Sequence, residues 1–227
     1  TRAGAAYLLG ELATPESADT IQALRNALQD PDPRVPYQAM RSLSLLNALT
    51  IKELLPFYEA NSPLITQYAT QALGVMPGEQ ATEVLSFLAA NEQASVAIRA
   101  LAIRYLGERE ASNASSQLTD LLLDDEPVLR QHAALALGRM GAFSSVKSLY
   151  QTLIDDDEDV RYAVGVALGL LGDVRTVPFL LKAKHYADEY TQQMVDLAFE
   201  RWGENALAEL LTAMRKLPLP YRVDAVE

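Results

Sequence analysis

The residues with the clearest potential for chemistry form an acidic run, Asp-Asp-Asp-Glu-Asp at positions 155–159. Carboxylate oxygens are the ligands that hard cations such as Ca²⁺ prefer, but the run lacks the glycine and the distant glutamate of a calcium-binding loop. A second acidic group, Asp124-Asp125-Glu126, begins 31 residues earlier. Acidic groups at a fixed interval are typical of a structural turn whose carboxylates cap the next helix and pair with arginine. We therefore expect no metal site here.

Other residue types that carry catalysis are scarce or isolated. The chain has no cysteine and two histidines, His132 and His185. His132 lies among alanines on a predicted helix, and His185 is expected at the surface. Gly-x-Ser-x-Gly, Walker-type and Gly-x-Gly-x-x-Gly motifs do not occur in the sequence. The sequence therefore predicts no catalytic residue, no cofactor and no bound metal.

Cations and aromatic residues near the C-terminal end are the strongest candidates for binding. Lys184 follows Leu153 by 31 residues, and Arg215 follows Lys184 by 31 residues, so cations occupy a position that was apolar one interval earlier. Because burial of a lone cation is unfavourable, each must be solvated or paired. Around them lie Lys182, His185, Tyr186, Tyr190, Arg201, Trp202 and Lys216.

Two interpretations of this basic-aromatic patch are open. Aromatic residues and arginine are enriched at interface hot spots, which favours a surface for a protein or an anionic group. Alternatively, the stem of Lys184 carries its ammonium to solvent, and Trp202 fills the apolar position that Leu171 holds 31 residues earlier. For Trp202 we favour the second interpretation.

An interval of about 31 residues organises the whole chain. A Leu-Gly pair recurs, and the spacings between successive copies are 34, 30, 33, 31, 31 and 31 residues. The positions that correspond to its glycine are Gly10, Ser44, Gly74, Gly107, Gly138, Gly169 and Glu200. A nearly constant period in this range is typical of stacked units, each too small to bury its own apolar face.

Each unit is predicted to contain two antiparallel helices, A and B. In the sixth unit Val160, Val164, Leu168 and Leu171 follow helical spacing, and Gly172 then ends helix A in the left-handed conformation. The predicted A helices cover residues 2–12, 34–46, 64–75, 96–107, 127–140, 159–171 and 189–202. The predicted B helices cover residues 17–29, 51–60, 80–90, 113–124, 144–154, 175–186 and 205–216.

Composition restricts the partners that the chain can bind. Hydrophobic residues make up 49% of the sequence and charged residues 22%, which is compatible with a continuous core. No apolar run reaches the roughly 18 residues that span a bilayer, so we expect no direct membrane insertion. The net charge of −11 opposes binding to nucleic acid and to anionic lipid. Both ends read as parts of repeats, so we expect a fragment of a longer chain.

The repeated residues resemble HEAT repeats, specifically the short bacterial type named for the phycobilisome lyases. The resemblance rests on Asp-x-x-Val-Arg followed by Ala-Leu-Gly-x-x-Gly, as at residues 157–161 and 167–172, and it covers nearly the whole chain. It implies a right-handed superhelix with the A helices outside and the B helices lining a concave surface. It also implies a ladder of arginines that pair with loop acids of adjacent units: Arg2, Arg99, Arg130 and Arg161. Pro36, Thr66 and Gln192 interrupt this ladder.

The sequence thus predicts an all-α HEAT-like repeat domain of about seven helix pairs over residues 1–227. Its predicted function is a non-catalytic scaffold or adaptor that binds another protein or peptide along the helix-B surface. The predicted contacts are Lys147, Tyr150, Gln151, Lys182, Lys184, His185, Tyr186 and Arg215.

A bilin lyase subunit or another chromophore-handling protein is the alternative function, in which Lys182, Lys184 and Arg215 would hold tetrapyrrole carboxylates. The deoxyhypusine hydroxylases are related HEAT-repeat enzymes that use repeated His-Glu pairs. Neither histidine of this chain precedes a glutamate, which excludes that activity.

Overall fold

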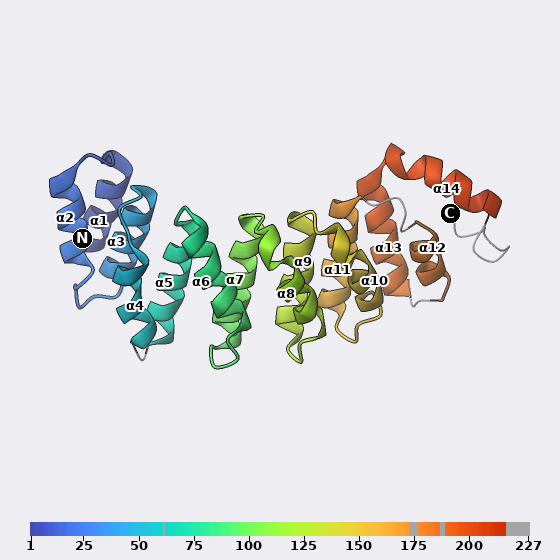
Figure 1. Cartoon of the computed structure of the whole chain (residues 1–227), viewed down its shortest axis with the longest axis horizontal. Coiled ribbons are helices and arrows are strands. Elements are labelled where there is room, and N and C mark those ends of the chain that lie inside the picture. Colours follow the sequence, from blue (N-terminus) through green and yellow to red (C-terminus); the bar gives the residue numbers. More distant parts are fainter. Residues whose placement is uncertain (61, 173–176, 187–188, 217–227) are drawn as a thin grey trace. The chain divides into compact units, whose positions relative to one another are not determined.

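The computed structural model describes residues 1–60, 62–172, 177–186 and 189–216, and every regular element in these ranges is a helix (Figure 1). The predicted all-α fold is therefore confirmed. The chain divides into two compact units, Thr1–Tyr105 and Leu106–Glu227, and the boundary falls within helix α7. In the described ranges, no helix combines the length and the apolar character needed to cross a membrane.

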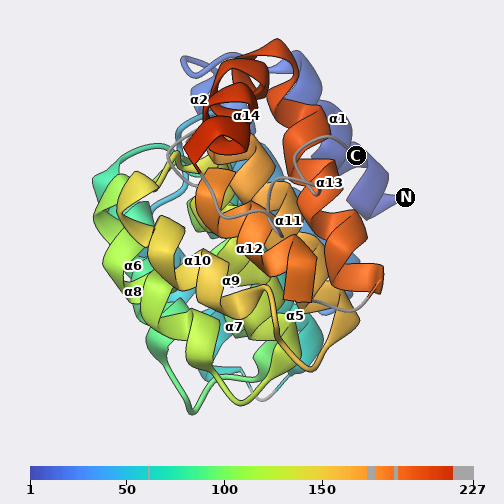
Figure 2. The same ribbon diagram turned by 90° about the vertical axis from the view of Figure 1, so that its right-hand side faces the viewer.

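Unit 1 (Thr1–Tyr105) is a stack of helical hairpins. Its A helices are α1 (Arg2–Leu12), α3 (Arg34–Leu45), α5 (Pro63–Val75) and the first part of α7 (Val96–Glu108). Its B helices are α2 (Ala18–Ala27), α4 (Ile51–Glu59) and α6 (Glu79–Ala90). Helix α3 packs between α1 and α5, while α2 packs against α3 and α4 against α5 (Figure 1 and Figure 2).

Unit 2 (Leu106–Glu227) repeats this arrangement. Its complete A helices are α9 (Pro127–Arg139), α11 (Glu158–Leu171) and α13 (Glu189–Trp202). On the B side lie α8 (Ser115–Asp120), α10 (Val146–Thr152), α12 (Val177–Tyr186) and α14 (Glu204–Lys216). The 3₁₀ turns η1 (Ser112–Ala114), η2 (Leu121–Leu123) and η3 (Phe143–Ser145) extend α8 and α10. Helix α11 packs between α9 and α13.

The recurring Leu-Gly pair is explained by close packing between A helices. A Cβ atom added at Gly138 would lie 2.7 Å from the Cα atom of Ala167, and one added at Gly107 would lie 2.7 Å from the Cα atom of Ala136. These distances are shorter than any normal contact, so only glycine allows the backbones to approach this closely. The Leu-Gly pair therefore recurs in the sequence because the same close contact between successive A helices recurs in the structure.

Leucines of the B helices fill the core beneath these contacts. Each of the first six B segments has at least one buried leucine, and these include Leu24, Leu54, Leu85, Leu118, Leu149 and Leu180. Such a set forms an apolar seam that no single hairpin could bury alone. The predicted hydrophobic basis of the repeat is confirmed within each unit.

Local residue choices fix the ends of the helices. Pro63 and Pro127 occupy the first positions of α5 and α9, where a missing amide proton costs no helical hydrogen bond. The Asp157 side chain accepts a hydrogen bond from the Val160 amide and caps α11. Gly172 ends the same helix with a φ of 60°, as predicted.

Candidate functional site

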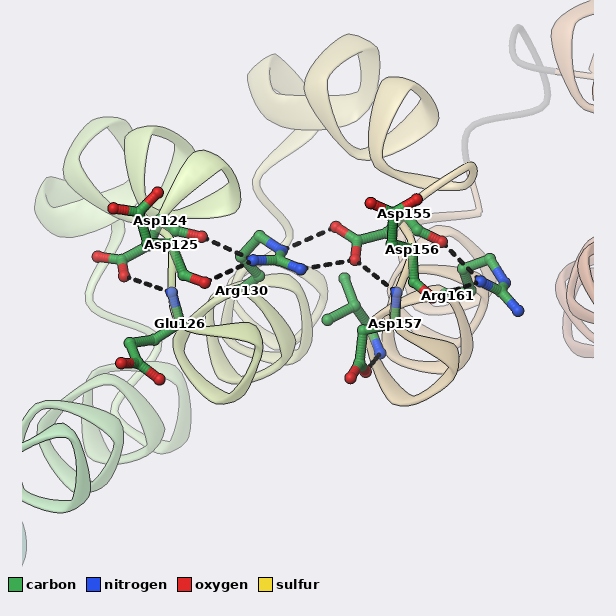
Figure 3. A network of polar contacts seen from close by, with 9 residues as sticks. Asp124, Asp125, Glu126, Arg130, Asp155, Asp156, Asp157 and Arg161 are labelled. Atoms are coloured by element: carbon green, nitrogen blue, oxygen red, sulfur yellow. Dashed lines mark hydrogen bonds and ion pairs between the residues drawn. The ribbon is translucent and has the colours of Figure 1, made fainter.

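A polar network in unit 2 joins two successive inter-repeat loops, each of which connects a B segment to the next A helix (Figure 3). The Arg130 Nε and Nη2 atoms donate to the two carboxylate oxygens of Asp155 at 2.8 and 2.7 Å. Its Nη1 atom donates to the carbonyl oxygens of Asp124 at 2.8 Å and Asp125 at 3.2 Å. One guanidinium thus ties its own loop to the loop of the next repeat.

The electrostatics of this network favour the ionised pair. Burial of Asp155 opposes its ionisation, but the hydrogen bonds from Arg130 and from the Asp157 amide outweigh burial and lower the pKa of Asp155. The side chains of Arg130 and Asp155 are 15% and 10% exposed. The pair is therefore largely shielded from the salt that screens surface ion pairs.

The acidic run at residues 155–159 acts as a turn. The Arg161 Nη1 atom donates to the carbonyl oxygens of Asp155 at 2.6 Å and Asp156 at 3.2 Å, and Asp157 caps the helix. The carboxylates therefore stabilise the loop and the helix start. Within the described residues, no group of three or more histidine, aspartate or glutamate side chains is arranged to hold a metal ion.

The arginine ladder that the family resemblance implies has a recognisable geometry. Arg99, Arg130 and Arg161 are each the fourth residue of their A helix, in α7, α9 and α11. The Arg99 Nε atom donates to the carbonyl oxygen of Ala89 at 3.1 Å, so this arginine holds the end of the preceding B helix, α6. Arg2 forms the corresponding ion pair with Asp30 at 2.7 Å in unit 1.

The structure also shows what replaces arginine at one interruption of the ladder. Thr66 is the fourth residue of α5, and its hydroxyl lies 3.3 Å from the carbonyl oxygen of Phe57 and 3.2 Å from that of Ser62. Threonine reaches nearby carbonyls but cannot fill the volume of an arginine side chain. Thr66 also lines a cavity, which is described below.

Three predicted partner contacts lie on α10. Lys147 and Gln151 are exposed and one helical turn apart, and neither forms an ion pair or side-chain hydrogen bond within the described residues. Tyr150 is half-buried, and burial raises the pKa of its hydroxyl. The helix thus presents a lysine and a glutamine to solvent on adjacent turns.

The remaining predicted contacts belong to α12 and α14. The Lys184 ammonium forms an ion pair with Asp196 of α13 at 3.1 Å, so this cation is paired, as its burial requires. His185 and Arg215 are exposed. The side chains of Lys182, Tyr186 and Tyr190 lie outside the residues that the structure describes.

Trp202 has the structural role that the sequence favours. It is 4% exposed, its indole nitrogen donates to the carbonyl oxygen of Leu168 at 3.0 Å, and its ring meets Phe199 edge-on. Trp202 therefore belongs to the core between α11 and α13. The basic-aromatic patch is consequently smaller than the sequence suggests.

A cavity in unit 1 was not predicted from the sequence. It lies among α4, α5, α6 and the start of α7, and its volume is about 640 Å³. Its lining includes Leu55, Thr66, Glu83, Val84 and Phe87. The one hint in the sequence is charge: residues 53–98 contain five glutamates and neither lysine nor arginine.

Tyr58, on the wall of this cavity, has an unusual environment. Its hydroxyl is buried, and no hydrogen-bond partner in good geometry is found for it among the described residues. Burial raises the pKa of Tyr58 to about 12, and the neighbouring Thr70 side chain offsets this only in part. This part of the cavity wall is therefore more apolar than the presence of a tyrosine hydroxyl suggests.

Comparison with known proteins identifies the repeat. The family model described as HEAT repeats matches the chain in three overlapping segments, residues 51–137, 86–164 and 116–200. None of the curated protein sequences compared matches the chain.

Three solved structures are similar to this chain, and two of them have a TM-score above 0.5. A crystal structure of an engineered protein has a TM-score of 0.53 and 17% identity, covering 82% of this chain and 97% of that one. A second engineered protein has a TM-score of 0.54 and 18% identity, covering 80% of this chain and 98% of that one. The complex of CpcE and CpcF of phycocyanin lyase from Nostoc sp. has a TM-score of 0.46 and 19% identity, covering 96% of this chain and 89% of that one. At these identities the similarity concerns fold alone.

Proposed function

Because this chain belongs to the HEAT-repeat family, we propose that it is a non-catalytic scaffold that binds a partner protein along its helix-B surface. The observation that carries the proposal is the exposure of large apolar side chains on B segments: Leu55 and Phe87 in unit 1, and Leu123 and Ile154 in unit 2. Exposed apolar groups rimmed by polar residues are typical of protein interaction sites.

The internal polar networks support a role in binding over one in catalysis. Arg130, Asp155, Arg161 and Asp157 bond one another or the loop backbone, so their charges stabilise the repeat. Lys147 and Gln151, in contrast, are exposed on α10. We propose these two residues, with Tyr150, His185 and Arg215, as polar contacts of the partner; Lys182, Lys184 and Tyr186 complete the predicted set.

Charge reversal tests this surface. The full chain is used to capture partners from native extract, and the partner is then purified and titrated by calorimetry. Lys147→Glu should weaken its binding about tenfold, because interface cations form charge-assisted contacts. Arg139→Glu is the matched control, since Arg139 is exposed on the A helix α9 of the same unit. Equal affinity of wild type and Lys147→Glu would remove α10 from the proposed surface.

The alternative function in bilin attachment is tested separately. It requires basic side chains able to meet tetrapyrrole carboxylates, but the ammonium of Lys184 is already engaged by Asp196. This engagement favours the scaffold. Addition of a free bilin should leave the visible spectrum of the pigment unchanged, whereas a shifted and intensified absorption band would favour the alternative.

A further inference from the structure

We propose that the cavity among α4, α5 and α6 binds a basic, apolar peptide segment of the partner, which inserts one bulky side chain and places lysine or arginine beside it. The inference rests on the proposed scaffold function, and it specifies the partner's chemistry. All residues that form the cavity belong to unit 1.

The cavity lies at an interruption of the arginine ladder, since Thr66 is one of the residues that line it. One repeat later Arg99 is 8% exposed and donates to the carbonyl oxygen of Ala89 in the preceding helix. Thr66 is several atoms shorter and bonds carbonyl oxygens of its own neighbourhood. The unfilled volume of about 640 Å³ is within the range of sites that take small ligands or a few side chains.

The surface of the cavity favours apolar groups. Val84, Leu88 and Ile98 contribute to its lining, and Leu55 and Phe87 stand at its edge with 51% and 67% of their surface exposed. Water on this surface is released when an apolar side chain enters, which provides the driving force. An aliphatic or aromatic anchor is the group that gains most.

The negative charge around the cavity favours basic residues next to the apolar side chain that enters it. Of the five glutamates in residues 53–98, Glu53 forms an ion pair with Arg25, and no ion pair of the other four is found among the described residues. Glu59, Glu79, Glu83 and Glu92 are exposed, and Glu83 lies on the cavity wall. With no lysine or arginine in the same segment, this surface attracts cations over a distance of about 8 Å at physiological salt. A lysine-flanked or arginine-flanked segment is therefore preferred over an acidic one.

The probe for this inference is a fluorescein-labelled decapeptide with leucine and phenylalanine set between lysines. Two copies serve as controls: one with glutamate in place of lysine, and one with serine in place of leucine and phenylalanine. Anisotropy measures binding to the full chain. The basic apolar peptide should bind at least about tenfold more tightly than either control copy.

Two variants of the protein test the cavity itself. Phe87→Ser removes the exposed apolar edge, and Thr66→Arg restores the ladder residue and fills the space; each should weaken binding about tenfold. Leu12→Ser is the matched control, because Leu12 is 80% exposed in the same unit but distant in sequence from the cavity lining. Far-UV circular dichroism verifies that each variant is folded.

The outcomes are distinct. Binding that is lost in Phe87→Ser and Thr66→Arg but retained in Leu12→Ser supports the inference. Failure of the wild-type chain to prefer the basic apolar peptide, or equal binding by all variants, overturns it. If the natural partner still binds both cavity variants with wild-type affinity, the scaffold function stands and the cavity is not its site. If no partner binds any form of the chain, the scaffold proposal fails as well.

Discussion

Replacement of Arg130 by methionine is the sharpest test of how neighbouring repeats are joined. Arg130 donates two hydrogen bonds to the Asp155 carboxylate and two to loop carbonyl oxygens. Methionine retains the apolar stem but leaves the Asp155 carboxylate and both carbonyl groups without this donor. The perturbation therefore removes polar contacts while changing side-chain volume little.

The expected loss is about 2–4 kcal/mol in the free energy of unfolding. Breaking a fully buried ion pair typically costs roughly 3–5 kcal/mol, because one charge remains buried without a partner. Here the two side chains are 15% and 10% exposed, so water can partly solvate Asp155 and the lower part of that range applies. Arg34, whose side chain is 76% exposed in its ion pair with Asp32, should give a clearly smaller loss when changed to methionine, because solvent screens this pair.

Urea unfolding followed by far-UV circular dichroism at pH 7 measures both variants. A double-mutant cycle with Asp155→Ala isolates the pairwise coupling, since the double variant should lose less than the sum of the single losses. Additive losses, or equal midpoints for Arg130→Met and Arg34→Met, would refute the claim that this pair joins the two loops.

The same pair predicts a pH dependence. The pKa of Asp155 is lower in the folded chain than its ordinary value, so the folded state binds fewer protons than the unfolded state. Its stabilisation is complete above the ordinary carboxyl pKa of about 4 and is lost as the pH falls through the lower folded value. The Arg130→Met variant should lack this acid-sensitive component.

Three further predictions concern single positions. Gly138→Ala should destabilise the chain by about 1–3 kcal/mol despite the better helix propensity of alanine, because the new Cβ would lie 2.7 Å from the Ala167 Cα atom; thermal unfolding measures this, and a raised melting temperature would contradict it. Tyr58→Phe should preserve or raise stability, since it removes a buried hydroxyl for which the described residues supply no hydrogen-bond partner in good geometry; a clear loss in urea unfolding would show that the hydroxyl is satisfied. The Asp32 carboxyl should titrate at about pH 2 by NMR because Arg34 hydrogen-bonds it, and Arg34→Ala should return its pKa toward the ordinary range; an unchanged titration would exclude that cause.

Much of the fold is determined locally and can be predicted from the sequence. The 31-residue interval places glycine or a small residue where A helices approach closely, and it places a leucine of each of the first six B segments in the core. Helix starts and ends follow from residues such as Pro63, Asp157 and Gly172, whose preferences depend on adjacent backbone alone. The sequence was sufficient for these features because each rests on spacing or on a residue's own conformational limits.

The sequence could not specify which groups the residues of the basic-aromatic patch contact in the folded chain. Because Lys184 stands at a repeat position that is apolar one unit earlier, the sequence indicated that its ammonium must be paired or solvated. Its partner, Asp196, lies on the following helix and could not be identified in this way. Trp202 was correctly assigned to the core, although its bond to the Leu168 carbonyl oxygen could not be foreseen. A side chain's partner across two helices depends on the distance and rotation between them, which periodicity does not specify.

Only the tertiary structure shows that a cavity lies at one interruption of the arginine ladder. Thr66 could be recognised in the sequence as the wrong residue at an arginine position, but the sequence does not show whether neighbouring side chains fill the space. In the folded unit Leu55 and Phe87 instead remain largely exposed at its edge. The volume of a cavity depends on all the surrounding helices together, whereas a repeat pattern describes each position separately. For that reason the sequence determined the repeat, and packing determined where the repeat leaves a cavity.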